Sequence, residues 1–271
     1  MCRNAPGIER VPRLDRGALD LLLSCPVPTS RKGIRMTTAT AALPRPPSEQ
    51  RILLHGVSWQ TYEALLHEFD CRPIRLTYDH GSLEIRTLSF RHECCSHLLG
   101  RLINVLTEEL NLPIHSGGST TFREEAKQRG LEPDECYWVQ NEPRMRGRKE
   151  FDIDADPPPD LAIEVDITRS SLNRLAIYAT LGVGEVWRFD GTSLRVYCLQ
   201  AGEDYALSEN SPTFPRLPIA EVLRFLRGID QMNETGLVRA FRAWVRKHVL
   251  PLTKGKKKRS PAPRTKGRPG K

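Results

Sequence analysis

Two acidic residues stand where a carboxylate could carry out chemistry. Glu164 lies in the middle of residues 161–167, a short run rich in isoleucine and valine that is typical of a strand buried on both faces. A carboxylate at the centre of such a strand is unfavourable unless a cation, a proton or a hydrogen bond compensates it. Asp134 follows Pro133 at the start of an aromatic segment, where it could also simply initiate a turn. Glu164 is therefore the residue that most needs a chemical explanation.

A strand–helix–strand unit positions Glu164. Three prolines and Asp160 precede the first strand, and Gly182 and Gly184 end the helix that follows it. Its length of about thirty residues suits a crossover that joins two parallel strands. The unit comprises a strand at 161–167, N-cap residues at 168–171, a helix at 172–181 and a strand at 185–189.

The remaining periodic segments predict a mixture of helices and strands without internal repeats. Ser58 can cap the first helix, and Asn233 can cap the last one. The predicted elements are a helix at 58–69, a hairpin at 74–86, a helix at 92–110, short strands at 113–116 and 120–123, strands ending at Val139 and at Leu199, and helices at 218–228 and 233–248.

The formal net charge of +8 belongs to the ends of the chain. Residues 251–271 hold nine Lys or Arg and no acid, whereas residues 50–250 hold 24 basic and 29 acidic residues and are therefore mildly acidic. A basic DNA-binding cleft consequently does not follow from the pI of 9.3. By composition, residues 1–49 are a disordered N-terminal extension, in which Met36 is a second candidate start, and residues 251–271 are a basic disordered tail. The tail cations expected to contact nucleic acid are Lys254, Lys256, Lys257, Lys258 and Arg259.

The seven cysteines are odd in number and show no Cys-x-x-Cys spacing. This pattern argues against a zinc finger or a disulfide framework and favours a reducing cytoplasm. No apolar run approaches membrane-spanning length, so no membrane partner is expected.

Several motifs occur together in a recognisable order. They are TYDHGSLEI at 77–85, SGGSTT at 116–121, EPDE at 132–135, PDLAIEV at 159–165, LNRLAIYA at 172–179 and GVGEVW at 182–187. In this order they resemble the Uma-two family of bacterial restriction-endonuclease-like proteins, within the PD-(D/E)XK nuclease superfamily. The resemblance covers about residues 52–250. It implies an α/β fold with a restriction-endonuclease-like core, a mixed central β-sheet flanked by helices, and a C-terminal helical extension.

The resemblance also implies a metal centre. In the superfamily an Asp at the start of one strand and an acid on the next hold Mg²⁺, and here these positions are Asp134 and Glu164. Mg²⁺ prefers oxygen ligands and keeps several waters, so the backbone carbonyl of Val165 would complete the protein's share, and Mn²⁺ could substitute. Such an ion would activate water and offset the charge of a scissile phosphate, which makes a DNA endonuclease the expected function.

The chain departs from the superfamily pattern at one position. The expected Lys, two residues after the acid, is replaced by Asp166. Arg174 on the following helix matches a basic position of the family and is the substitute catalytic candidate, although it could instead be a solvated surface residue. Arginine can stabilise a charged transition state but stays protonated, so it cannot act as a base. Further acids that could support the metal ligands are Asp160, which could alternatively cap the strand entrance, Glu93 and Asp166 itself.

Two functions remain open. The first is a Mg²⁺-dependent DNA endonuclease, favoured by the pair Asp134 and Glu164. The second is a catalytically inactive nuclease fold that binds nucleic acid or a protein partner, favoured by Asp166. DNA is the expected partner in the first case, and a homodimer is open in both.

Overall fold

The computed structural model describes residues 49–70, 72–168, 170–201 and 204–251. Most of the expected extension 1–49 and of the expected tail 251–271, including the basic residues 254–259, lies outside the described residues. Glu49, which the expected boundary assigns to the extension, is buried and is part of the folded body.

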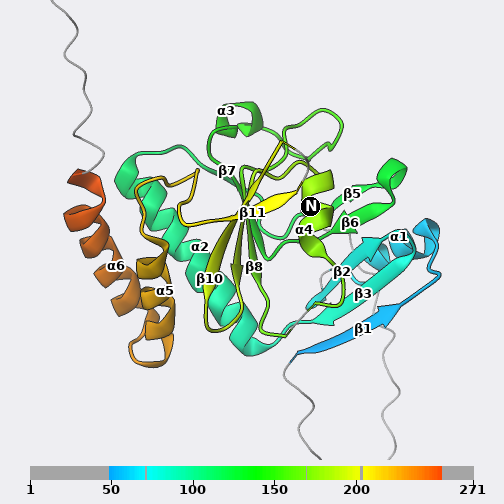
Figure 1. Ribbon diagram of the computed structural model, residues 1–271, viewed down its shortest axis with the longest axis horizontal. Helices are drawn as coiled ribbons and strands as arrows, with labels where there is room; N and C mark the ends of the chain where they lie inside the picture. The colour runs from blue at the N-terminus through cyan, green and yellow to red at the C-terminus, as the bar shows by residue number, and fades with distance from the viewer. Residues whose placement is uncertain (1–48, 71, 169, 202–203, 252–271) are drawn as a thin grey trace, which may run out of the picture. The chain divides into compact units, whose positions relative to one another are not determined.

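The first sheet has five antiparallel strands in the order β1-β3-β2-β6-β5 (Figure 1). Its centre is the hairpin of β2 and β3, which confirms the hairpin predicted at 74–86. The strand β1 was not predicted, and it pairs with the outer edge of β3. The five strands are β1 (Gln50–Leu54), β2 (Ile74–Asp79), β3 (Ser82–Thr87), β5 (Phe122–Glu124) and β6 (Arg129–Leu131).

The two faces of β3 have different surroundings. Leu83 and Ile85 belong to an apolar cluster with Trp59 of α1 (Trp59–Glu68), a helix that begins at the predicted cap Ser58. Successive residues of a strand point to opposite faces, so Glu84 and Arg86 lie on the side of β3 away from this cluster. Both charged side chains are nevertheless buried, because a second sheet covers that side.

The second sheet has six strands in the order β11-β10-β9-β8-β7-β4. Strands β8 and β9 are parallel and every other neighbouring pair is antiparallel, so the sheet is mixed, as predicted. The crossover between β8 and β9 is α4 (Arg174–Thr180), which also contacts β6 of the first sheet and so lies between the two sheets. The strands are β4 (His115–Ser116), β7 (Glu135–Trp138), β8 (Leu161–Val165), β9 (Glu185–Phe189), β10 (Leu194–Leu199) and β11 (Tyr205–Ser208).

Helices α2 and α5 cover one face of the second sheet, and α6 packs against α2. Figure 1 shows α5 and α6 beside α2, and their apolar residues form one cluster with β8, β9 and β10. Helices α5 and α6 are the predicted C-terminal helices, and the α/β fold class is confirmed. The helices are α2 (Phe90–Leu110), α5 (Ile219–Arg227) and α6 (Glu234–His248), with a short α3 (Glu142–Met145) and single 3₁₀ turns at Glu125–Lys127 and Gly228–Asp230.

Two of the predicted boundaries near Glu164 are wrong. The strand predicted at 161–167 ends at Val165, because Asp166 turns into the loop while its amide still donates to the carbonyl of Phe189. The helix predicted from 172 begins at Arg174, and its cap is Asn173 rather than a residue of 168–171. Asn173 accepts a hydrogen bond from the amide of Ala176, which satisfies one of the free donors of the first turn. Among the described residues, no helix is both long and apolar enough to cross a membrane.

Candidate active site

The pairing of β7 with β8 brings the two predicted acids together. Asp134 directly precedes β7, and its amide donates to the carbonyl of Ile163 at 3.1 Å. In return, the amide of Val165 donates to Asp134 Oδ2 at 2.7 Å. Glu164 lies between these two backbone contacts, so both carboxylates sit at the same end of neighbouring strands. This is the arrangement that the sequence predicts.

Asp134 is a buried carboxylate that is fully hydrogen-bonded. Its Oδ1 accepts from Arg86 Nη2 at 2.8 Å and lies 3.0 Å from His92 Nε2. Burial alone would raise the pKa of Asp134, but the charge of Arg86 and the hydrogen bond from His92 outweigh it and hold the pKa well below its usual range. Asp134 is therefore ionised at neutral pH.

Glu164 is compensated on one oxygen only. Arg174 and Tyr178 both donate to its Oε1, whereas its buried Oε2 has no partner among the described residues. Burial raises the pKa of Glu164 above its ordinary value, although the charge of Arg174 opposes this shift. The unpartnered oxygen is a free acceptor inside the protein.

Arg174 is buried and not a solvated surface residue. It is the first residue of α4, and its guanidinium reaches across to the first sheet, where it donates to Thr77 and to the carbonyl of Glu132. Because it also donates to Glu164, it ties the crossover helix to both sheets. Burial would lower the pKa of Arg174, but Glu164 outweighs it and the pKa rises further, so Arg174 carries a permanent positive charge.

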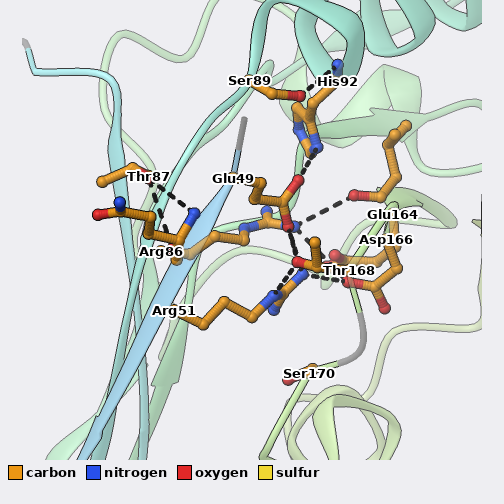
Figure 2. A network of polar contacts seen from close by, with 12 residues as sticks. Glu49, Arg51, Arg86, Thr87, Ser89, His92, Glu164, Asp166, Thr168 and Ser170 are labelled. Atoms are coloured by element: carbon orange, nitrogen blue, oxygen red, sulfur yellow. Dashed lines mark hydrogen bonds and ion pairs between the residues drawn. The ribbon is translucent and has the colours of Figure 1, made fainter. Parts of the chain in front are cut away.

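A second group of ion pairs surrounds Asp166 (Figure 2). Asp166 Oδ1 accepts from Arg51 at 2.8 Å, and its Oδ2 is 2.7 Å from Arg188. Arg51, from β1, also donates to Glu49 and Glu84, and Glu49 lies 3.6 Å from the imidazole of His92. Each of the five buried acids of the centre therefore has at least one arginine as a partner. These acids are Glu49, Glu84, Asp134, Glu164 and Asp166.

Two of the acids predicted to support the metal ligands, Asp160 and Glu93, do not belong to this group of buried acids. Asp160 lies at the other end of β8, where it accepts from the amides of Val139 and Asn141 and so caps a loop. The structure does not bring it to the centre. Glu93, in the first turn of α2, is exposed and lines a small pocket with Asp134.

Sequence reasoning missed Arg86, His92 and Arg51. Arg86 and Glu84 alternate with apolar residues on β3, a pattern that ordinarily indicates a solvated face. His92 opens a helix, and Arg51 lies in a strand that was not predicted. The signal that could have indicated such residues was the buried carboxylate, because a buried carboxylate requires a cation or a hydrogen-bond donor from elsewhere in the chain.

The centre opens to solvent through two neighbouring cavities. The first, of about 240 Å³, is lined by Asp134, His92 and Glu93. The second is an open groove of about 1210 Å³ between α1 and the loops near Thr120 and Phe151. Their linings have two residues in common, Arg75 and Ser119, so the groove leads towards Asp134. The arginines of the groove are Arg72, Arg75 and Arg123, and its acids are Glu63, Asp70, Glu132, Glu150 and Asp152.

Comparison with known families shows the family of the chain. Residues 59–230, well over half of the chain, match Uma2, a family described as "Putative restriction endonuclease". The chain belongs to the Uma2 family. Among solved structures, it is similar to a putative nuclease belonging to DUF820 from Anabaena variabilis, at 14% identity and a TM-score of 0.39, with 56% of this chain and 90% of that chain covered. No curated protein matches the chain significantly.

Three oxygen donors of this Uma2 protein could hold a Mg²⁺ ion. Asp134, Glu164 and the Val165 carbonyl offer oxygen ligands at adjacent strand ends, and Glu164 Oε2 has no other partner. Within the described part of the chain, no three His, Cys, Asp or Glu side chains converge as a metal cluster, so water would supply the remaining ligands. The donors fit Mg²⁺ on one condition. Arg86, which donates to both Asp134 and Val165, must release them.

Proposed function

We propose that this Uma2 protein is a DNA endonuclease that hydrolyses phosphodiester bonds with Mg²⁺. Asp134, Glu164 and the Val165 carbonyl would hold the ion. The observation that carries this proposal is the convergence of Asp134 and Glu164 at one end of β7 and β8, beside a pocket that reaches solvent. Asp134 lines this pocket, and paired carboxylates beside such an opening suit a divalent ion that must meet a phosphate.

The ion and Arg174 would have different roles in the reaction. When bound, the ion would supply a nucleophilic hydroxide and offset the charge of the phosphate. Arg174 cannot act as a base because it stays protonated, and its bonds to Glu164, Thr77 and Glu132 make it a positioning residue for Glu164. This revises the direct catalytic role expected from the sequence.

The groove offers a path for the DNA strand. Arg75 lines both cavities, and Arg72 and Arg123 lie farther along the larger one. Guanidinium groups bind phosphate oxygens through paired N–H donors, and the hydroxyl of Ser119 can add a hydrogen bond. The acids of the same groove would limit its affinity for DNA in the absence of a divalent ion.

Cleavage of supercoiled plasmid tests this function. The wild-type protein should nick or linearise the plasmid in Mg²⁺ or Mn²⁺ and not in EDTA, and Asp134→Asn should be slower by about tenfold or more because it removes a charged ligand. The matched control is Asp154→Asn, which changes an exposed acid without a side-chain partner in the described structure. Equal cleavage by wild type and Asp134→Asn would contradict the proposed centre.

A catalytically inactive protein that binds nucleic acid is the second candidate. The observation in its favour is that Arg86, Arg174 and His92 already compensate Asp134 and Glu164 without a metal. In that case the wild-type protein would bind duplex DNA but would leave the plasmid intact in every divalent ion. The plasmid experiment therefore separates the two candidates.

The basic residues 251–271 are expected to contribute non-specific affinity for DNA. Nine Lys or Arg without an acid should contact phosphates and not bases. If most of them neutralise phosphates, log K against log salt should have a slope on the order of −5 to −8. A chain ending at Leu250 should lose most of this slope and keep its metal-dependent cleavage at high enzyme concentration. Filter binding across a salt series measures the slope, and an unchanged slope after truncation would show that these residues do not bind DNA.

A further inference from the structure

Arg86 occupies the part of the centre that a metal ion would need. It extends from β3 towards the ends of β7 and β8, and its side chain is only 1% exposed. Nη2 donates to Asp134 Oδ1 at 2.8 Å, and Nη1 donates to the Val165 carbonyl at 3.2 Å. These two oxygens are also two of the three that would hold Mg²⁺. A single guanidinium therefore bridges the expected ligands.

The ion and Arg86 cannot use Asp134 in the same way at the same time. Asp134 Oδ1 already faces Arg86 and His92, and Oδ2 faces the amide of Val165. A carboxylate oxygen has two lone pairs, so Oδ1 has no free position for an inner-sphere metal bond. Two cations at van der Waals distance inside a protein also repel each other strongly. Metal binding through Asp134 Oδ1 therefore requires Arg86 to move.

Asp166 provides Arg86 with another partner. Its Oδ1 lies 3.6 Å from Arg86 Nη1, just beyond hydrogen-bond distance, so a small rotation of the guanidinium would complete the contact. Arg86 would then stay buried and compensated, which a move towards an apolar region would not allow. Asp166 stands two residues after Glu164, so both carboxylates lie near the end of β8.

We propose that Arg86 is an internal counter-cation that closes the metal position, and that a divalent ion binds in exchange for the movement of Arg86 from Asp134 and Val165 onto Asp166. This inference rests on the proposed function, because it takes Asp134 and Val165 as metal ligands. It assigns a specific role to Arg86, which limits the affinity for the ion, and to Asp166, which receives Arg86 when the ion enters.

Calorimetry with Mn²⁺ on the full-length chain tests the exchange. Arg86→Met removes the competing charge but keeps a side chain of similar length, so it should bind Mn²⁺ about tenfold or more tightly than wild type. The matched control is Arg216→Met, since Arg216 lines neither cavity and bonds to no carboxylate in the described structure. Arg216→Met should leave the Mn²⁺ affinity unchanged. Weaker or equal binding by a folded Arg86→Met protein would overturn the proposal.

Asp166→Asn provides an independent test in which Arg86 is intact. Without the second carboxylate, Arg86 should remain on Asp134, and Mn²⁺ should bind about fivefold or more weakly than to wild type. A crystal of the wild-type protein soaked in Mn²⁺ should show Arg86 Nη2 no longer within hydrogen-bond distance of Asp134. An ion bound to Asp134 with the Arg86 contact retained would also overturn the proposal.

The plasmid assay and the Mn²⁺ affinities distinguish failure of the proposed function from failure of the proposed exchange. If the plasmid remained intact while Arg86→Met and Asp166→Asn shifted Mn²⁺ affinity in opposite directions, the exchange would stand and the nuclease activity would not. If the plasmid were cleaved but neither variant changed the affinity, the nuclease would stand and the exchange would not.

Discussion

An Arg174→Leu protein should lose about 3–5 kcal/mol of the free energy of unfolding, because it leaves a buried carboxylate without its charge partner. Arg174 is bonded to Glu164, to Thr77 and to the carbonyl of Glu132, and leucine replaces none of these donors. The loss should appear as a lower midpoint in urea unfolding followed by circular dichroism. Arg174→Lys should lose less, since lysine keeps the charge but cannot reproduce all three bonds.

Arg239→Leu is the matched control for this prediction. Arg239 lies exposed on α6 and has no side-chain partner in the described structure, so its replacement should change stability by less than about 0.5 kcal/mol. If Arg174→Leu cost no more than this control, Glu164 would have to be protonated in the folded protein, and its proposed role as a metal ligand would need revision.

The stability of the metal-free protein should fall by about 3 kcal/mol between pH 6.5 and pH 9 because of His92. Burial lowers the pKa of His92, but the carboxylates of Asp134 and Glu49 outweigh it and raise the pKa to about 9, above the ordinary value of 6.5. The folded state therefore holds this proton more tightly than the unfolded state does. The stabilisation is complete below pH 6.5 and is lost as the pH rises through 9.

Urea unfolding at a series of pH values measures this dependence. His92→Asn should remove most of the slope between pH 6.5 and pH 9, because asparagine can donate a hydrogen bond but does not titrate. His67→Asn, which removes an exposed imidazole on α1, should leave the slope as in wild type. A wild-type slope that survives in His92→Asn would assign the dependence to other groups.

Local sequence patterns were sufficient for most of the fold and for Glu164, whereas Asp134 was assigned to the centre through the family resemblance. The apolar run around Glu164 predicted a buried strand, and the crossover of 161–189 is present with β8 and β9 parallel. The partners of these acids were not predictable in the same way. The local pattern of β3 predicts that Arg86 is solvated. Arg86 is buried because the second sheet covers that face of β3, and no local pattern encodes which sheet covers which face.

Strand geometry explains the acid that the structure places elsewhere. Asp160 stands four residues before Glu164, and both lie on the approach to or within one strand. An extended strand rises about 3.3 Å per residue, so four residues separate them by roughly 13 Å. Asp160 therefore bonds the loop at Val139 and Asn141, while Glu164 reaches the centre.

The pairing of β1 with β3 has a consequence for the order in which the chain folds. Arg51 meets Asp166 across 115 positions of sequence, and Glu49 meets Thr168 across 119. Contacts of such long range close large loops and form slowly compared with the hairpin of β2 and β3. During synthesis, the contacts of Arg51 with Asp166 and of Glu49 with Thr168 must wait for more than a hundred further residues. The centre is thus completed late, and until then Arg51 has only Glu49 and Glu84 as acidic partners.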